Sequence, residues 1–209
     1  MKSRTLHTGL SCRNAEYIHT PLIEIVPMES DQQLCEAAAT LSEEDILLFT
    51  SRFSAIYWHK AMLKMGRSWG SNQIVSIGST TTRTLESLGA THILQCEKDD
   101  SYGVIDTFKD FDNTHRIIFP RSNIALPIIP EGLRKLGFEV KTIDAYQNQM
   151  PLHPEMVNLE DIDTIIFTSP STIDNFIQLY GSLPKGKEYK TRGVVTQHHL
   201  EEKLKEIQL

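Results

Sequence analysis

Leu47-Leu48-Phe49-Thr50-Ser51 returns later in the chain as Ile165-Ile166-Phe167-Thr168-Ser169. In each copy an aspartate stands four residues before the phenylalanine, at Asp45 and Asp163. A Gly-x-x-Thr motif follows each copy after about one βα unit, as Gly78-Ser79-Thr80-Thr81 and as Gly193-Val194-Val195-Thr196. Two matching signals at matching spacing predict two similar α/β domains that face one another. A cleft between two such domains is a common place for a ligand.

Length and composition place the chain among ordinary globular proteins. Its 209 residues suffice for one large domain or two small ones, and 40% hydrophobic with 23% charged residues is typical of soluble proteins. No apolar run approaches the length that spans a bilayer. Met1–His7 has no apolar core like that of a signal peptide. We therefore expect a cytoplasmic protein that does not bind a membrane.

Charge and cysteine usage exclude further classes. The net charge of −6 argues against a nucleic-acid partner, because a phosphate-binding face needs a basic surplus. A small anionic ligand stays compatible, since it responds to local charge and to backbone N–H groups. The cysteines Cys12, Cys35 and Cys96 are scattered, which fits a reducing compartment. They give neither a disulfide framework nor a metal-ligand spacing, so no metal is expected.

Short apolar runs that end in Thr, Ser or Gly alternate with helical patterns, as in βα units on a parallel sheet. The predicted buried strands are Ile46–Phe49, Ile74–Ile77, Arg116–Phe119 and Thr164–Phe167. Helical spacing follows both Phe-Thr-Ser copies, and Gly89 is placed to stop the helix after Thr81. Pro130 is expected to open a short helix that Gly137 ends. The last helix takes its apolar face from Leu200, Leu204 and Ile207.

Two extended segments, at about 22–27 and 140–146, lie at opposite ends of the inner repeat. We infer that they run side by side as a two-stranded connector between two α/β domains with parallel sheets. One domain is then the continuous stretch 27–143. The other is discontinuous and combines 1–24 with 147–209.

An ordered set of motifs resembles uroporphyrinogen-III synthase, the cosynthase of tetrapyrrole biosynthesis. The set comprises the crossing strand Pro21–Ile25, both Phe-Thr-Ser copies, Ile77-Gly78-x-x-Thr81 with Leu85 and Gly89, and Pro130–Val140 leading to Tyr146. The resemblance implies two Rossmann-like domains and a cofactor-free carbon–oxygen lyase (a hydro-lyase) of porphyrin and heme biosynthesis. Its substrate would be hydroxymethylbilane, cyclised to uroporphyrinogen III with inversion of the last pyrrole ring and loss of water. A spirocyclic intermediate is the usual proposal for this family, and we expect a monomer.

The chain departs from the family pattern in three places. The family's Thr-Arg-Pro-like element appears here as His7-Thr8-Gly9-Leu10, and Thr50–Phe53 lacks the usual Pro or Asn. The discontinuous domain also ends one helix after Thr196, so we expect it to lack a final strand and helix that the inner domain has. If that strand is a sheet edge, the domain survives with less buried surface.

The hydroxyl-bearing turns have two compatible interpretations. Thr50-Ser51 and Thr168-Ser169 are helix N-caps, and a capped N-terminus also presents free N–H groups to a carboxylate. Gly78–Thr81 and Gly193–Thr196 are tight strand-to-helix turns. Arg121-Ser122 follows the Arg116–Phe119 strand and either holds a carboxylate or is a solvated turn, and Arg52 at the first helix start has the same two interpretations. By resemblance, the candidate substrate-binding residues are Ser51, Arg52, Gly78, Ser79, Thr81, Arg121, Ser122, Thr168, Ser169, Ser171 and Thr196.

Tyr146 is the candidate catalytic residue. One interpretation is packing within a connector strand, a frequent role of tyrosine. By resemblance it is the cleft tyrosine of the family, whose phenol donates a proton or hydrogen bond to the departing hydroxyl. Loss of that hydroxyl gives an electrophilic azafulvene, so the substrate supplies much of the driving force. The protein would mainly hold the chain so that the substituted carbon of the last ring attacks.

Other chemistries have weaker support. His198 and His199 are adjacent, and neighbouring helical residues point about 100° apart, so they do not form one site. The chain has no phosphate-binding glycine loop and no nucleophile elbow, which disfavours a nucleotide-binding enzyme. A non-catalytic two-domain binding or regulatory protein that retains the fold stays open as the alternative.

Overall fold

The computed structural model describes residues 4–206, which divide into two compact units. Of the described residues, unit 1 comprises 4–24 with 149–206, and unit 2 comprises Ile25–Asn148. The chain therefore passes from one unit to the other twice, after Glu24 and after Asn148. Among the described helices, none combines the length and apolar character needed to cross a membrane.

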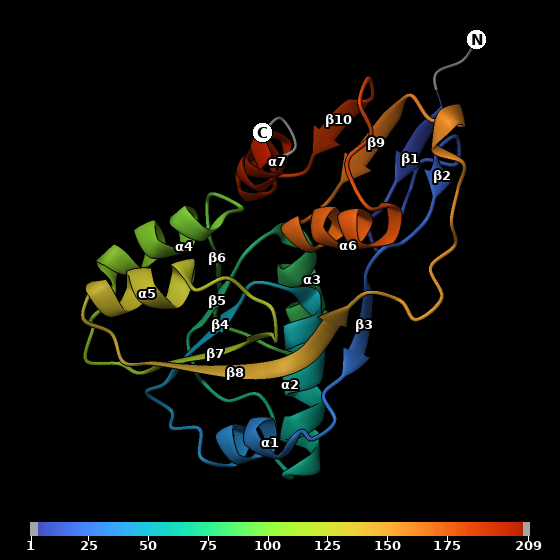
Figure 1. Cartoon of the computed structure of the whole chain (residues 1–209). Coiled ribbons are helices and arrows are strands. Elements are labelled where there is room, and N and C mark those ends of the chain that lie inside the picture. Colours follow the sequence, from blue (N-terminus) through green and yellow to red (C-terminus); the bar gives the residue numbers. More distant parts are fainter. Residues whose placement is uncertain (1–3, 207–209) are drawn as a thin grey trace. The chain divides into compact units, whose positions relative to one another are not determined.

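Unit 2 is a doubly wound α/β domain. Its sheet has the order β3-β8-β7-β4-β5-β6 (Figure 1), and every neighbouring pair from β8 to β6 is parallel. The strands are β3 (Glu24–Pro27), β4 (Ile46–Phe49), β5 (Ile74–Ser76), β6 (Ile93–Gln95), β7 (Ile117–Ser122) and β8 (Val140–Gln149). The helices are α1 (Gln32–Ala39), α2 (Arg52–Lys64), α3 (Ser79–Ser87), α4 (Ser101–Thr107) and α5 (Ile128–Lys135), with a 3₁₀ turn at Phe108–Asp110.

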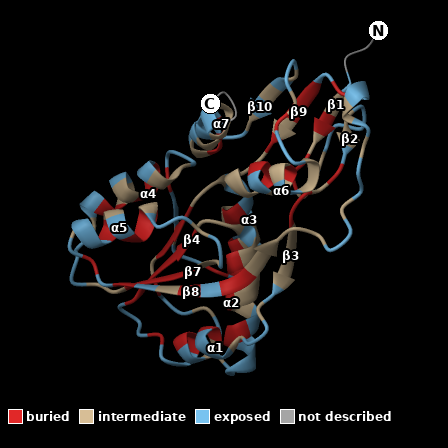
Figure 2. Ribbon diagram, in the orientation of Figure 1, coloured by how far each residue is buried: buried red, intermediate tan, exposed pale blue. Residues whose placement is uncertain are grey.

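The strand β4 shows why this sheet needs helices on both faces. All four of its residues are buried (Figure 2), and successive side chains of a strand point to opposite faces. Leu47 and Phe49 belong to a first core cluster, with residues of α1, α2 and α3. Ile46 and Leu48 belong to a second core cluster, with residues of α4 and α5.

Unit 1 is smaller and has a sheet of order β10-β9-β1-β2, in which all neighbouring strands are parallel. Its strands are β1 (Thr5–His7), β2 (Ile18–His19), β9 (Thr164–Phe167) and β10 (Glu188–Thr191). Its helices are α6 (Pro170–Tyr180) and α7 (Val194–Glu206), with a 3₁₀ turn at Leu159–Asp161. A single core cluster joins sheet and helices; its aromatic centre is Phe167 against Phe176, with ring centroids 5.4 Å apart.

Most predicted elements are confirmed. The four predicted strands correspond to β4, β5, β7 and β9, and β3 is hydrogen-bonded to β8 as expected of the two extended segments. Gly89 follows the end of α3 with φ of 86°, the left-handed conformation that glycine favours. Of the predicted face of the last helix, Leu200 is buried, whereas Ile207 lies outside the described residues.

Two boundary predictions are wrong. Pro130 does not open its helix, because α5 begins at Ile128 after Pro127. Pro130 is tolerated within the first turn of α5 because the N–H groups of that turn have no intrahelical partner. The strand predicted at Arg116–Phe119 continues to Ser122, so Arg121 lies within β7 and not in a turn after it. The apolar run that predicted this strand ends at Phe119, but β7 goes on pairing with the long strand β8 as far as Ser122.

Candidate functional site

The carboxyl edge of the unit 2 sheet gathers most of the predicted site residues. Parallel strands end at the same edge, where α/β proteins bind ligands. Ser51 follows β4, Gly78 follows β5, and Ser122 ends β7. Tyr146 pairs with Ser122 from the neighbouring strand β8. The topology thus brings together residues that lie far apart in the sequence.

A β-bulge places Tyr146. Arg121 pairs with Asp144, whereas the next residue, Ser122, pairs with Tyr146, so Ala145 is an extra residue in β8. Strand alternation alone would put Tyr146 on the face opposite Ala145. The bulge instead brings both side chains into the first core cluster.

The phenol of Tyr146 is held within this packing. Its ring lies 5.9 Å from that of Phe53 and stacks on Tyr57 at 6.0 Å, between centroids, and the residue is only 6% exposed. Its hydroxyl donates a hydrogen bond to Ser51 Oγ at 3.0 Å. Burial raises the pKa of the phenol, and the Ser51 hydrogen bond partly opposes this. Tyr146 is therefore a neutral hydrogen-bond donor at physiological pH, and the packing role expected of it is present.

Ser51 connects this phenol to the start of α2. It is the N-cap of the helix, and its Oγ accepts a hydrogen bond from Phe53 N at 3.0 Å. The same oxygen accepts from Tyr146 at 3.0 Å. A serine hydroxyl has two acceptor lone pairs and one hydrogen. Because both lone pairs are occupied, the Ser51 hydroxyl can only donate to a further group.

Two arginines border the same edge. Arg52 is exposed as the first residue of α2, and its guanidinium carbon lies 4.8 Å from the centroid of the Phe53 ring. Arg121 is mostly buried, donates to Leu126 O at 3.4 Å, and places its Nε 4.0 Å from Asp144 Oδ1. The Nε of Arg121 is buried without a hydrogen-bond partner among the described residues. Arg121 is thus a positioned cation, and its interpretation as part of a solvated turn is wrong.

The turn after β5 has the expected cap geometry. Gly78 has φ of 75° and directly precedes α3. Ser79 is tied to its own helix, because Arg83 donates to both its carbonyl oxygen and its Oγ at 3.1 Å. Thr81 is buried. Of this motif, Ser79 and the backbone around Gly78 are therefore the parts open to a ligand.

Unit 1 carries the second copy of the hydroxyl-bearing turns. Thr168 N donates to Thr172 Oγ1 at 3.2 Å, and Ser169 N to the same oxygen at 3.3 Å. Ser169 Oγ and Ser171 Oγ share a hydrogen bond of 2.9 Å at the start of α6. Thr196 is buried, and its hydroxyl donates to Arg192 O at 3.0 Å. Pro170, the first residue of α6, has no N–H, and Thr172 N donates to Ser169 O at 3.1 Å, so the hydroxyls of Ser169 and Ser171 are the main donors of this copy.

Sequence reasoning missed three cationic or titratable residues at this edge of unit 1. His7 is the last residue of β1, His19 is the last residue of β2, and Arg192 directly follows β10. The two imidazole centroids lie 5.7 Å apart. The available signal was that each of the three residues comes directly at the end of a short strand. Among residues 4–206, no group of three or more His, Cys, Asp or Glu side chains is arranged to hold a metal ion.

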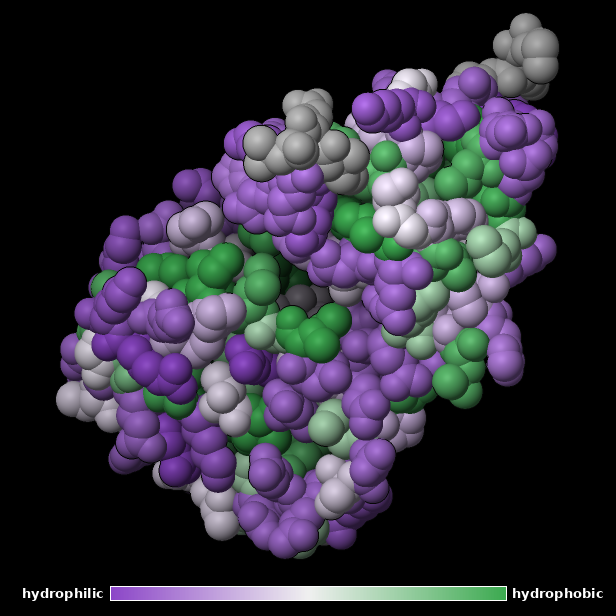
Figure 3. All heavy atoms as spheres, in the orientation of Figure 1, coloured by the Kyte–Doolittle hydropathy of each residue, from purple (hydrophilic) through white to green (hydrophobic). Residues whose placement is uncertain are grey.

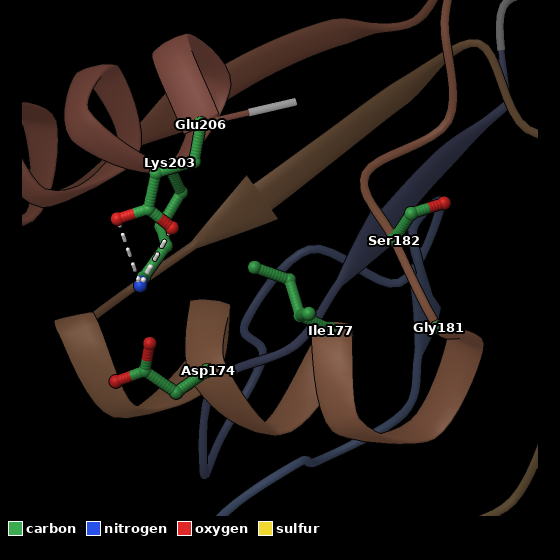
Figure 4. Close-up of a pocket in the computed structure, with 6 residues that line it drawn as sticks. All are labelled: Asp174, Ile177, Gly181, Ser182, Lys203 and Glu206. Carbon is green, nitrogen blue, oxygen red and sulfur yellow. Dashed lines mark hydrogen bonds and ion pairs between the residues drawn. The ribbon is translucent and has the colours of Figure 1, made fainter. Parts of the chain in front are cut away.

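A pocket of about 190 Å³ lies between α6 and α7 (Figure 4). Its lining combines Ile177 with charged residues, and Lys203 forms an ion pair with Glu206 across 3.1 Å. Gly181, Ser182 and Glu206 lie at or beyond the carboxyl ends of the helices. Helices that follow parallel strands run back along the sheet, so these residues lie at the end away from the strands' carboxyl edge. The pocket is therefore distinct from the candidate site.

Comparisons with known proteins identify a family that matches almost the whole sequence. Residues 4–207 match the model of the family described as uroporphyrinogen-III synthase HemD. The uroporphyrinogen-III synthase of Synechococcus elongatus is 25% identical over 83% of this chain and 69% of its own length. That of Chlorobaculum parvum is 25% identical over 65% of this chain and 60% of its own length. The chain thus spans about two thirds of the length of the curated relatives it matches.

Solved structures show the same fold. Uroporphyrinogen III synthase from Thermus thermophilus aligns with a TM-score of 0.68 at 16% identity, covering 96% of this chain and 88% of that one. The enzyme from Helicobacter pylori aligns with a TM-score of 0.59 at 15% identity and the same coverage. Because the family model matches almost the whole sequence, the chain belongs to the uroporphyrinogen-III synthase family.

Proposed function

We propose that this protein cyclises hydroxymethylbilane to uroporphyrinogen III, with inversion of the last pyrrole ring and loss of water. The observation that carries the proposal is the family match over residues 4–207. The proposal includes a monomeric protein that acts in the cytoplasm without a cofactor or a metal.

The donors at the two carboxyl edges suit a flexible polycarboxylate. In unit 2 they are the N-terminus of α2, the backbone around Gly78, and the cations Arg52 and Arg121. In unit 1 they are the hydroxyls of Ser169 and Ser171 at the start of α6. Helix N-termini and guanidinium groups both bind carboxylates. A protein of net charge −6 can therefore hold several carboxylates through local donors.

The reaction requires little from the protein in the bond-breaking step. The C–O bond of the hydroxymethyl group breaks, the oxygen takes one proton and leaves as water, and the pyrrole nitrogen supplies electrons to the resulting azafulvene. The substituted carbon of the last ring then attacks, giving a spirocyclic intermediate. The bond between that carbon and its original methylene bridge then breaks, which leaves a second azafulvene on the neighbouring ring. The free carbon of the last ring attacks this azafulvene and loses its proton, which balances the proton that left with water. The protein's main contribution is to orient the chain for the first attack.

We expect Tyr146 and Ser51 to assist departure of the hydroxyl. The neutral phenol donates to Ser51 Oγ, and the serine hydrogen is left to point to a further acceptor. A leaving hydroxyl at that position receives a hydrogen bond from Ser51, strengthened by the donation from Tyr146. Because the phenol acts through Ser51 in this geometry, Tyr146 serves as a positioning residue.

A coupled assay tests this function. Hydroxymethylbilane is generated enzymatically, and the type I and type III products are resolved after oxidation. We expect type III product from the wild-type chain. We also expect Tyr146→Phe to lower kcat by about tenfold or more with the type III product retained. Tyr102→Phe is the matched control, because Tyr102 is 61% exposed on α4.

One result would contradict the proposed activity, and another would contradict only the role of Tyr146. Type I product alone from folded wild-type protein would favour a binding or regulatory role. An unchanged kcat for Tyr146→Phe would remove the phenol from the mechanism while leaving the overall activity in place.

A further inference from the structure

Four side chains form a row along the carboxyl edge of the unit 1 sheet. The strand order β10-β9-β1-β2 places Arg192, Thr168, His7 and His19 in that spatial sequence, one at or just after the end of each strand. His7 and His19 are direct partners in the β1–β2 ladder, and their rings meet edge to face at 65°.

Gly9 allows this arrangement. A Cβ at Gly9 would lie 2.6 Å from the Thr168 side chain and 2.9 Å from His7 Cε1, so any larger residue would displace them. Gly9 N also donates to His7 Nδ1 at 3.3 Å, and Gly9 O lies 2.7 Å from His19 Nε2. The backbone of Gly9 therefore contacts both imidazole rings.

These contacts assign the imidazole hydrogens. His7 Nδ1 accepts a hydrogen bond, so neutral His7 carries its hydrogen on Nε2. A carbonyl oxygen only accepts, so His19 must carry a hydrogen on Nε2 to bond Gly9 O. His7 Nε2–H is thus a donor that no described hydrogen bond uses, and His19 Nδ1 gains a hydrogen only on protonation.

Burial lowers the pKa of His7 most strongly, and the two charged groups that lower it further are His19 and Arg192. The strand between them, β9, contributes the uncharged Thr168. Among the described residues, His7, His19 and Arg192 form no ion pair with a carboxylate. Within residues 4–206, this edge therefore carries cationic groups that no carboxylate pairs.

We propose that His7, His19 and Arg192 form a carboxylate-binding site that tightens as the pH falls. The proposal rests on the proposed function in one respect: the natural ligand would be a carboxylate of the linear tetrapyrrole. Arg192 supplies a guanidinium group, and His7 adds positive charge on protonation. Thr168 adds a hydroxyl between them.

The direction of the pH effect follows from linkage. Without ligand, burial and positive neighbours favour neutral His7. A bound carboxylate favours the imidazolium form, so binding takes up a proton. Affinity then increases as the pH falls through and below 6.5, the ordinary pKa of histidine.

Imidazole NMR on the full chain tests the site, with tricarballylate as the carboxylate probe at pH 7.5 and 5.5. We expect the His7 and His19 signals to shift on titration, with Kd about tenfold lower at the lower pH. His7→Gln should abolish most of the pH dependence, and Arg192→Gln should weaken binding at both pH values. His153→Gln is the control, because His153 lies exposed in a loop of the same unit.

The outcomes separate this site from the enzymatic activity. Backbone amide spectra of the variants report whether each remains folded. Histidine signals that stay unmoved, or a Kd independent of pH, would overturn the site even if the wild type makes type III product. Probe binding with the expected pH dependence, but without type III product, would support the site and contradict the proposed activity.

Discussion

The duplicated aspartates, Asp45 and Asp163, allow a matched test of what the repeat does for stability. Asp45 is only 4% exposed and accepts two hydrogen bonds from Arg116, at 3.0 and 2.8 Å, and one from Ser42 N at 2.8 Å. Asp163 is exposed and accepts one hydrogen bond from Arg4 N at 2.8 Å. The same position in the motif therefore holds a buried ion pair in unit 2 and a surface contact in unit 1.

The expected losses differ several-fold. Removing one partner of a buried ion pair typically destabilises by about 3–5 kcal/mol, because a charge and its hydrogen-bond donors are left unpaired. The Arg116 side chain is 32% exposed and regains some water, so we expect about 3 kcal/mol for Asp45→Ala. Asp163→Ala removes one solvent-exposed hydrogen bond, which contributes about 1 kcal/mol or less.

Urea unfolding followed by tryptophan fluorescence measures this difference. Both tryptophans, Trp58 and Trp69, lie in unit 2, so the signal follows that unit. Asp45→Ala should lower the midpoint of the fluorescence transition strongly, and Asp163→Ala should leave it nearly unchanged. Equal shifts for the two variants, or a loss below about 1 kcal/mol for Asp45→Ala, would refute the assignment of Asp45 as a buried structural partner.

Three further outcomes follow from local geometry. Ser51→Ala should destabilise unit 2 by about 2 kcal/mol, because it removes a helix cap and leaves the Tyr146 hydroxyl unpaired; a fluorescence transition shifted by less than about 0.5 kcal/mol would contradict this. Burial raises the pKa of Tyr189 to about 12, so this phenol should stabilise the fold below pH 10, and that contribution should be lost as the pH rises toward 12. Tyr189→Phe should reduce the alkaline loss of unfolding free energy, and an unchanged profile would argue against this source. Gly103→Ala should cost about 1–3 kcal/mol in thermal unfolding, because the new Cβ would lie 2.5 Å from Lys98 O; wild-type stability would show that the α4 turn adapts.

Pattern recognition predicted the fold well because hydrophobic periodicity and capping are local signals. The buried strands, the caps at Ser51 and Ser169, and the stop at Gly89 all depend on residues within a few positions of one another. The composition also predicts a polar exterior. The face shown in Figure 3 is largely hydrophilic, with scattered apolar patches. Local chemistry therefore sufficed for the elements and their class.

Tertiary register limited the prediction of the site. The bulge at Ala145, which brings Tyr146 onto the face covered by α2, depends on pairing with Arg121 and Ser122. No pattern within β8 indicates that extra residue. The extension of β7 through Ser122 has the same origin, since a partner strand and not an apolar run sustains it. Burial of Thr81 likewise depends on how α3 packs on the sheet.

The two carboxyl edges also show where a duplicated architecture keeps its chemistry. The residues common to both copies, such as Ser51 and Ser169, cap helices and so secure the backbone of each edge. The side chains that distinguish the two edges are absent from the repeat: Tyr146, which acts through Ser51 in unit 2, and His7 and Arg192 in unit 1. A cap must recur wherever a strand turns into a helix, whereas a proton donor is needed once. Within this chain, the differences between the two copies therefore indicate function better than their shared motif does.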